Sequence, residues 1–145
     1  MTGNARSDHS STPAPVTLPD YQALAAFRRS LRAFLHFSEQ AARAEGLTST
    51  QHQLLLAVKG VPTSQLPTIA DVAESLKLRH HSAVELVDRA VAAGLVERRA
   101  DPDDGRRQRV ALTPLGERKL ASLSALHRHE LQRFKQDTIF HLESL

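Results

Sequence analysis

The spacing of apolar residues changes within one stretch of the sequence, between Leu76 and Thr113. In its first half, five apolar residues recur three or four positions apart, which is the spacing of one helix face; they are Ala83, Leu86, Val87, Ala90 and Val91. Gly94 follows, and glycine tolerates the positive φ at which helices commonly end. From Leu95 to Leu112 the chain alternates as strands do, on both sides of a turn. The stretch therefore predicts a helix that leads into a β-hairpin.

The predicted helix has one face free to contact another molecule. At 3.6 residues per turn, its polar side carries His81, Ser82, Glu85, Asp88 and Arg89. The hairpin turns through residues 101–105, which are all turn formers, and arginines flank this turn. On the returning strand, Val110 and Leu112 face one way, while Arg109 and Ala111 face the other. A free polar helix beside an arginine-bearing hairpin is the layout of a winged helix-turn-helix, in which the helix enters the major groove of DNA.

Further motifs extend this pattern over residues 47–119. In chain order they read LTSTQHQLL, TIADVAESLKL, HHSAVELVDRAVAAGLV, DPDDGRR and RVALTPLGE. The most specific part is the ordered set VDR, GLVER, D-x-R at Asp104 and Arg106, and V-x-LT from Val110 to Thr113. In this order and spacing the motifs resemble the MarR family of bacterial transcription regulators. The resemblance covers about half of the chain. It implies a mainly α fold with a small β-wing, in which a winged helix-turn-helix lobe joins long N- and C-terminal dimerisation helices.

The chain divides into four predicted segments. Residues 1–19 have little to bury and predict a disordered or loosely ordered tail. Residues 20–46 predict a long amphipathic helix, residues 47–113 the DNA-binding lobe, and residues 114–145 a second long helix. The two helices carry more apolar surface than the lobe could cover, which predicts a partner subunit. The resemblance implies that they interlock in a two-fold homodimer; the alternative is that both fold back on their own subunit.

Local signals place the elements of the lobe. Thr48 and Gln51 predict a capping box at the start of its first helix. Thr68 and Ile69 predict a short strand that pairs with the wing, and residues 71–76 a short supporting helix. Thr113, followed by proline, predicts the N-cap of the last helix.

Nine residues are predicted to contact DNA; they are Arg79, His80, His81, Ser82, Glu85, Arg98, Arg99, Arg106 and Arg107. His81 and Ser82 lie in the first turn of the recognition helix and can bond to base edges. Arg106 at the wing tip is the candidate for minor-groove insertion, and Arg98, Arg99 and Arg107 are candidates for phosphate contacts. Arg79 and His80 lie at the beginning of the helix, and His80 is expected to reach the DNA backbone. The resemblance implies that Asp104 pairs with the wing arginine and holds its orientation. Arg79 stands where Ser or Thr usually caps the helix, which costs about 1 kcal/mol.

The overall charge permits DNA binding without demonstrating it. The formal net charge is +3, and acidic residues are interspersed among the arginines of residues 76–113. A solvated, self-paired surface is therefore the alternative interpretation of these charges. The corresponding alternative function is a winged-helix module that binds another protein and no DNA.

The resemblance also implies control by a small molecule. In many members of the family an aromatic or phenolic acid enters a crevice between the dimer helices and the lobe. The candidates for such a crevice here are Phe27, Phe34, His36, Phe37 and His52, although such residues on an amphipathic helix are also ordinary core residues. The sequence thus predicts a regulator, expected to be a repressor, that binds a palindromic operator as a homodimer and is released by such a ligand.

Other functions find little support in the sequence. The absence of cysteine excludes disulfides and thiolate metal sites. The histidine pairs at 80/81 and 127/129 diverge on a helix, so no metal site is expected. No nucleophile elbow, phosphate loop or HExxH motif is present, and we expect neither an enzyme nor a cofactor. No apolar run reaches the roughly 20 residues that span a bilayer, and no signal peptide is recognisable, so we expect a cytoplasmic protein without a membrane partner.

Overall fold

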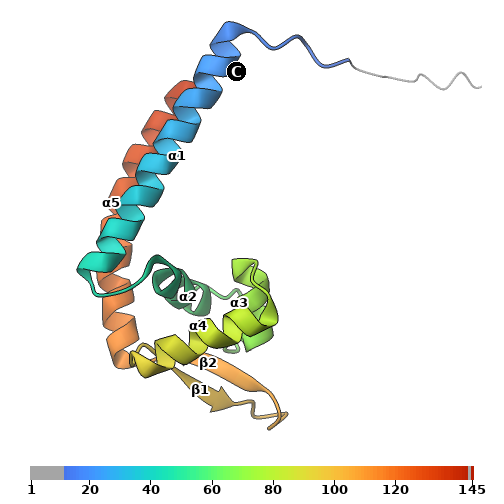
Figure 1. The fold of residues 1–145 in the computed structure, drawn as a ribbon, viewed down its shortest axis with the longest axis vertical. Helices are drawn as coiled ribbons and strands as arrows, with labels where there is room; N and C mark the ends of the chain where they lie inside the picture. The colour runs from blue at the N-terminus through green and yellow to red at the C-terminus, as the bar shows by residue number, and fades with distance from the viewer. Residues whose placement is uncertain (1–11, 144) are drawn as a thin grey trace, which may run out of the picture.

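The computed structural model describes residues 12–143 and 145. Within them, five helices and a two-stranded antiparallel sheet form in the order α1 (Leu18–Ala44), α2 (Ser49–Lys59), α3 (Ile69–Leu76), α4 (His80–Ala92), β1 (Val96–Ala100), β2 (Gln108–Leu112) and α5 (Pro114–Leu142). The long helices α1 and α5 lie side by side, and the other elements form a lobe at one end of the pair (Figure 1). The predicted fold class, mainly α with a small β-wing, is confirmed.

The boundaries differ from the predicted ones by a few residues. Helix α1 begins two residues earlier than expected, because Thr17 and Asp20 form a capping box at its start. Most of the tail predicted for residues 1–19 lies outside the described residues, and residues 12–17 have no regular structure. Ile69 does not join a strand as predicted, since it is the first residue of α3; Thr68 alone forms an isolated bridge with Arg109 of the wing.

Threonine opens four of the helices in the described part of the chain. The side chains of Thr17, Thr48, Thr68 and Thr113 each accept the backbone N–H of the third helical residue. The predicted capping box at Thr48 and the predicted cap at Thr113 are confirmed. Helix α4 differs, because its N-cap is Arg79 and no side chain caps it.

The core lies where the lobe meets the base of the long helices. Its fully buried side chains are Leu54, Leu55, Val72, Val87, Leu95, Val96, Val110 and Leu123. Helix α4 buries Ala83, Val87 and Ala90 as predicted, whereas Val91 at the edge of that stripe is exposed. On β2, Ala111 is buried like its neighbour Val110, so the wing is covered on both sides where it enters the core.

The sheet is a hairpin whose register places Val96 opposite Leu112 and Ala100 opposite Gln108. The N–H of Val110 donates to the carbonyl of Pro67 at 2.9 Å, which attaches β2 to the loop before α3. Gly116 in the first turn of α5 lies against the backbone of Leu95 at the start of the wing. The base of α5 and the wing are therefore in direct backbone contact.

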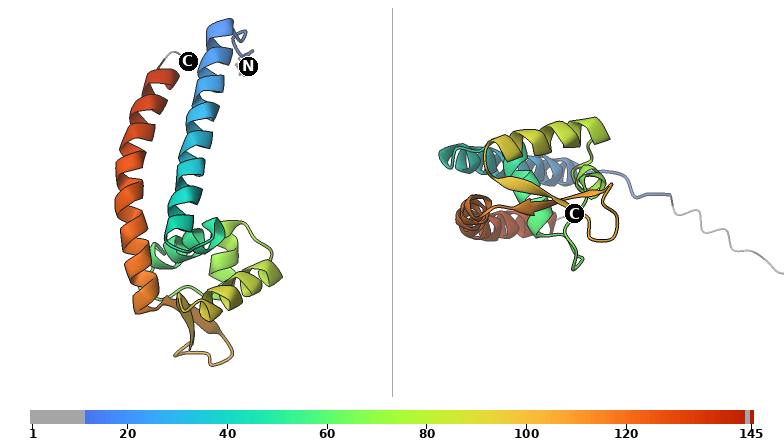
Figure 2. Two further views of the ribbon diagram at one scale, coloured as in Figure 1. Left: turned by 60° about the vertical axis from the view of Figure 1, so that its left-hand side comes forward. Right: turned by 90° about the horizontal axis from the view of Figure 1, so that it is seen from below.

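The long helices α1 and α5 run side by side (Figure 2), and aromatic rings pack between them. Phe134 of α5 lies 6.5 Å from Phe27 and 5.4 Å from Phe34 of α1, measured between ring centroids. Large apolar side chains remain exposed near the far ends of both helices; they are Leu18, Tyr21, Leu24, Ile139, Phe140 and Leu142. None of the helices among the described residues combines the length and apolarity that crossing a membrane requires.

Candidate nucleic-acid interface

The outer face of α4 presents the polar residues expected from its sequence. His81, Glu85 and Arg89 are exposed, and Ser82 is half-buried. The opposite face is fixed by the buried Ala83 and by the core behind it. Helix α4 thus buries one side and exposes the other, and it lies in the lobe at the opposite end of the molecule from the N-terminus of α1 (Figure 1).

A tight turn orients α4 against α3. Lys77 ends α3 in the left-handed region, with φ 55° and ψ 40°, and the N–H of Leu78 returns to the carbonyl of Ala73 at 2.9 Å. A residue with a side chain pays about 1 kcal/mol for this conformation. The turn leaves Arg79 in an extended conformation as the first residue before α4.

The tip of the wing is a turn held by backbone bonds. The N–H of Asp101 donates to the carbonyl of Arg107, and the N–H of Arg107 donates to the carbonyl of Asp104, both at 3.0 Å. The Asp104 carboxylate accepts the backbone N–H of Arg106 at 3.0 Å. We expected the Asp104 carboxylate to pair with the guanidinium of Arg106. In the described structure it bonds to the backbone of Arg106 instead, and so shapes the turn. The side chains of Arg106 and Arg107 are exposed beyond this turn.

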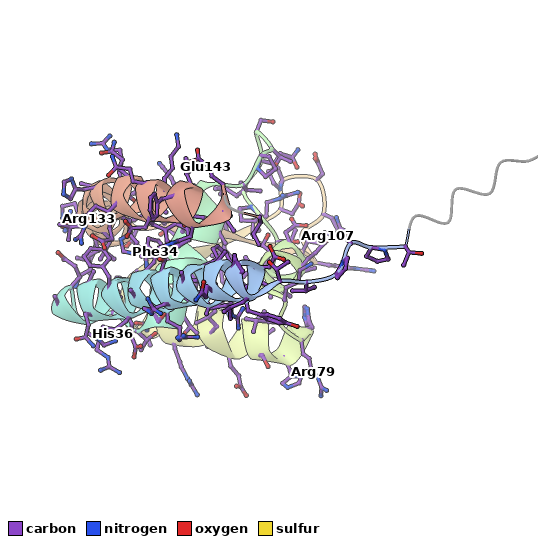
Figure 3. All side chains as sticks on the ribbon, turned by 90° about the horizontal axis from the view of Figure 1, so that it is seen from above. Phe34, His36, Arg79, Arg107, Arg133 and Glu143 are labelled. Atoms are coloured by element: carbon purple, nitrogen blue, oxygen red, sulfur yellow. The ribbon has the colours of Figure 1, made fainter. Side chains whose placement is uncertain are left out.

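The two arginines of β1 are paired within the protein. Arg98 forms an ion pair with Asp88 of α4, and Arg99 forms one with Glu97 at 2.7 Å. By contrast, no ion pair involves Arg79, Arg106 or Arg107 among residues 12–143 and 145. Of the arginines predicted to contact DNA, those without an ion pair in the described structure therefore lie before α4 and at the wing tip, and Figure 3 shows Arg79 and Arg107 toward the same end of the lobe.

A hollow lies between the first residue of α4 and the wing tip. It has a volume of about 780 Å³ and is bordered by residues of three elements and two turns; they include Ser64, Asp71, His80, Gly105, Arg106 and Arg107. His80 thus faces the wing, across this hollow, and does not lie on the outer face of α4. The start of α4 and the wing tip therefore border one concave surface.

A buried ion pair at the base of the wing was not anticipated from the sequence. The Nε and Nη2 atoms of Arg109 lie 3.0 and 2.8 Å from Oδ2 of Asp101, and both side chains are largely buried. The backbone N–H of Asp103, followed by the Arg109 guanidinium, lowers the pKa of the Asp101 carboxyl below its ordinary value. Alternation groups Arg109 with Ala111, on the side opposite Val110 and Leu112, but a strand pattern does not show the loop that covers Arg109.

A second concave surface lies between α1, α2 and α5. This crevice has a volume of about 850 Å³, and its lining includes Phe34, Leu35, His52, Leu56, His127, Arg128, Leu131 and Lys135. Of the residues predicted for a ligand crevice, Phe34 and His52 line it. Phe27 packs on Phe134 instead, Phe37 packs toward the core, and His36 is exposed on α1 (Figure 3).

His127 is one of the crevice residues that the sequence did not predict. Its Nδ1 lies 2.7 Å from the carbonyl of Leu123, its Nε2 lies 2.8 Å from the hydroxyl of Ser38, and its ring centroid is 4.7 Å from that of His52. Burial, together with the nearby His127, lowers the pKa of His52. Within the described residues, no cluster of three or more His, Asp or Glu is arranged to hold a metal ion.

Comparisons with known proteins agree with this geometry. A family model described as MarR family matches residues 45–107, from the end of α1 to the wing tip. The chain is 28% identical to a MarR family transcription regulator of known structure, over 80% of this chain and 75% of that one, with a TM-score of 0.67. Comparison with curated proteins finds no match.

Two further solved structures share the fold. One is AbsC, a MarR family transcriptional regulator from Streptomyces coelicolor, at 19% identity, 86% and 84% coverage of the two chains and a TM-score of 0.69. The other is a variant of MepR from S. aureus bound to an oligodeoxyribonucleotide, at 20% identity, 84% coverage of each chain and a TM-score of 0.65. The lobe of this chain thus matches the model of the MarR family, and the chain as a whole shares the fold of MarR family transcription regulators.

Proposed function

We propose that this chain is a transcription regulator of the MarR family that binds duplex DNA as a homodimer, with α4 in the major groove and the wing over the adjacent minor groove. The observation that carries the proposal is the concave surface shared by the start of α4 and the wing tip, bordered by Arg106 and Arg107. A recognition helix and a wing placed in this way can engage neighbouring grooves at once. A MepR variant that shares the fold is bound to an oligodeoxyribonucleotide, which supports DNA as the partner.

The exposed residues of the interface divide by chemistry. His81 and Ser82 bond to base edges, and Glu85 accepts from the exocyclic amine of cytosine. Arg106 enters the minor groove, where a narrow A·T-rich stretch deepens the negative potential. Arg79 and Arg107 contact phosphates, and His80 lies close enough to the hollow to contact the backbone.

The two arginines of β1 are expected to contribute little to DNA affinity, because both form ion pairs in the free protein. Arg98 and Arg99 must leave Asp88 and Glu97 before either can contact a phosphate. Each exchange replaces one charge pair by another, so its net gain is small. We therefore expect these two residues to contribute less affinity than Arg106.

The far ends of α1 and α5 provide the surface for the homodimer. Phe140 is 75% exposed and Leu18 is 69% exposed, and both belong to the apolar group at this end of the long helices. Large apolar side chains gathered in this way commonly mark an interface between subunits. A two-fold dimer would present two α4 helices to half-sites about 34 Å apart, which requires a palindromic operator. Occupation of such an operator would repress the gene behind it.

The crevice between α1, α2 and α5 is the proposed effector site. Leu56 and Leu131 are each about half exposed along its walls, and Arg128 and Lys135 border it, a combination that suits a small aromatic acid. The crevice adjoins both the long helices and the lobe. A ligand that prefers one angle between them would change the separation of the two α4 helices and lower DNA affinity by its differential binding.

Selection of bound fragments from random duplex DNA tests the proposal. We expect enrichment of a palindrome whose half-sites are one helical turn apart. Arg106→Ala should weaken binding to the enriched duplex, and Arg133→Ala, which removes the same charge from an exposed position on α5, should not. Recovery of no duplex at low salt would contradict DNA binding and favour the alternative of a protein-binding module.

A further inference from the structure

The buried guanidinium of Arg109 joins three segments of the lobe. Asp101 follows β1, Arg109 lies on β2, and Gln65 and Leu66 belong to the loop between α2 and α3. We propose that Arg109 and Asp101 are positioning residues, which fix the angle of the wing to the rest of the lobe and so place Arg106 for DNA binding. This inference rests on the proposed function.

The contacts of Arg109 leave little of it available to DNA. Its Nε and Nη2 donate to Asp101, its Nη2 also donates to the side chain of Gln65 at 2.9 Å, and its Nη1 donates to the carbonyl of Leu66. A guanidinium has five N–H donors, and these contacts engage most of them. The side chain of Arg109 is only 14% exposed and that of Asp101 only 4%. Arg109 is therefore a poor candidate for a phosphate contact, although it lies on the wing.

The same contacts attach the wing to the element that supports α4. The N–H of Val110 donates to the carbonyl of Pro67, and Thr68, which caps α3, bridges to Arg109. An isolated two-stranded hairpin is marginally stable in water, so its direction depends on such attachments. Arg106 lies three residues from Arg109 along the chain, at the free tip of this hairpin. We call the contacts of Arg109 with Asp101, Gln65 and Leu66 the anchor. Without the anchor the wing tip would move in the free protein, and the entropy lost when DNA orders the tip would weaken binding.

Two acidic residues of the turn, Asp101 and Asp103, allow a test of DNA affinity. An effect of charge alone and a positioning role predict opposite results for Asp101. Asp101→Asn breaks the anchor, whereas Asp103→Asn removes the same charge from an exposed side chain with no bond of its own in the described structure. Simple electrostatics predicts slightly tighter DNA binding for both variants. Positioning predicts that Asp101→Asn weakens binding about tenfold, as expected when one charge-assisted contact of the wing is lost. Asp103→Asn should bind as well as the unmodified protein or better.

Arg109→Lys provides a second variant that keeps the charge. A lysine can act as a point charge toward phosphate, but it cannot bridge Asp101, Gln65 and Leu66 together. We expect weaker binding, and we expect Arg106→Ala to cost much less in this background than alone, because the wing tip is already misplaced. Binding by Arg109→Lys equal to that of the unmodified protein, or additive effects of the two changes, would overturn the inference.

Limited trypsin digestion reports on the anchor without DNA. Cleavage after Arg106 and Arg107 should be faster in Asp101→Asn and Arg109→Lys than in the unmodified protein, and unchanged in Asp103→Asn. If the protein binds no duplex, the proposed function fails while this digestion still decides whether the anchor exists. Unchanged cleavage in both anchor variants, or faster cleavage with undiminished DNA affinity, would contradict a positioning role.

Discussion

Replacement of Gly116 by alanine should destabilise this protein, although the same change normally stabilises a helix. Gly116 lies in the first turn of α5, where alanine would gain about 1 kcal/mol of helix propensity. A Cβ at this position would lie 2.1 Å from the carbonyl oxygen of Leu95 and 3.1 Å from its carbonyl carbon. Both obstacles are backbone atoms, which no side-chain rotation can move. The first turn of α5 and the start of the wing would have to separate by about 1 Å, as in the overpacking of a dense core.

The expected loss follows from these opposing effects. Overpacking costs roughly 1 to 3 kcal/mol or more. Separation would also strain the bond from the N–H of Thr113 to the carbonyl of Leu95, now 3.0 Å long and worth about 1 kcal/mol. After the gain in propensity, we expect a net destabilisation of about 2 kcal/mol, or a fall in Tm of about 8 °C for a chain of this size.

Thermal unfolding followed by circular dichroism, at one fixed protein concentration, measures this change. Gly105→Ala is the matched control, since no atom lies within 4 Å of a Cβ placed there, and its Tm should stay within about 2 °C of that of the unmodified protein. If Gly116→Ala unfolds at the same temperature as the unmodified protein or higher, the close contact between α5 and Leu95 is refuted.

Four further outcomes are expected. Arg107→Ala should reduce the slope of log K against log salt by about 0.9, the contribution of one phosphate charge, and an unchanged slope would exclude that contact. Phe140→Glu should shift the proposed dimer toward monomers in sedimentation experiments without changing the helix content, because this side chain is exposed in the single chain; an unaltered association constant would contradict a dimer interface at this end of the long helices. Burial lowers the pKa of His52 in the folded protein, so as the pH falls the imidazole of His52 is protonated in the unfolded chain before it is protonated in the folded one. The stability that His52 contributes is full above about pH 6.5 and is lost below it, and His52→Asn should lose less stability than the unmodified protein between about pH 7 and pH 5 in denaturant titrations. Gly94→Ala should lower the denaturation midpoint by the equivalent of about 1 kcal/mol, because Gly94 has φ 72°, and an unchanged midpoint would show that the chain avoids this conformation at little cost.

Local patterns predicted the elements of the lobe well. The apolar spacing of Ala83, Val87 and Ala90 fixed the orientation of α4, and Gly94 marked its end. Both features depend on residues close together in the chain. The same holds for the threonine caps at Thr48 and Thr113, whose partners are three residues away.

Contacts between distant segments were not predictable in the same way. Arg109 is anchored by residues 43 and 44 positions away in the α2–α3 loop, and His127 is bonded to Ser38, 89 positions away. A single sequence carries no signal for such pairings. The sequence also predicted that Asp104 contacts Arg106. Which group of Arg106 it contacts, the backbone N–H or the guanidinium, depends on the geometry of the turn and was not predictable.

The contrast between the threonine-capped helices and α4 has a consequence for engineering. Replacing Arg79 with threonine would supply the missing cap and add about 1 kcal/mol to the unfolding free energy. The same replacement would delete a cation from the surface proposed to meet phosphate. A search for thermostable variants of this protein would therefore select Arg79→Thr early, and the most heat-resistant survivors would be the least able to hold an operator.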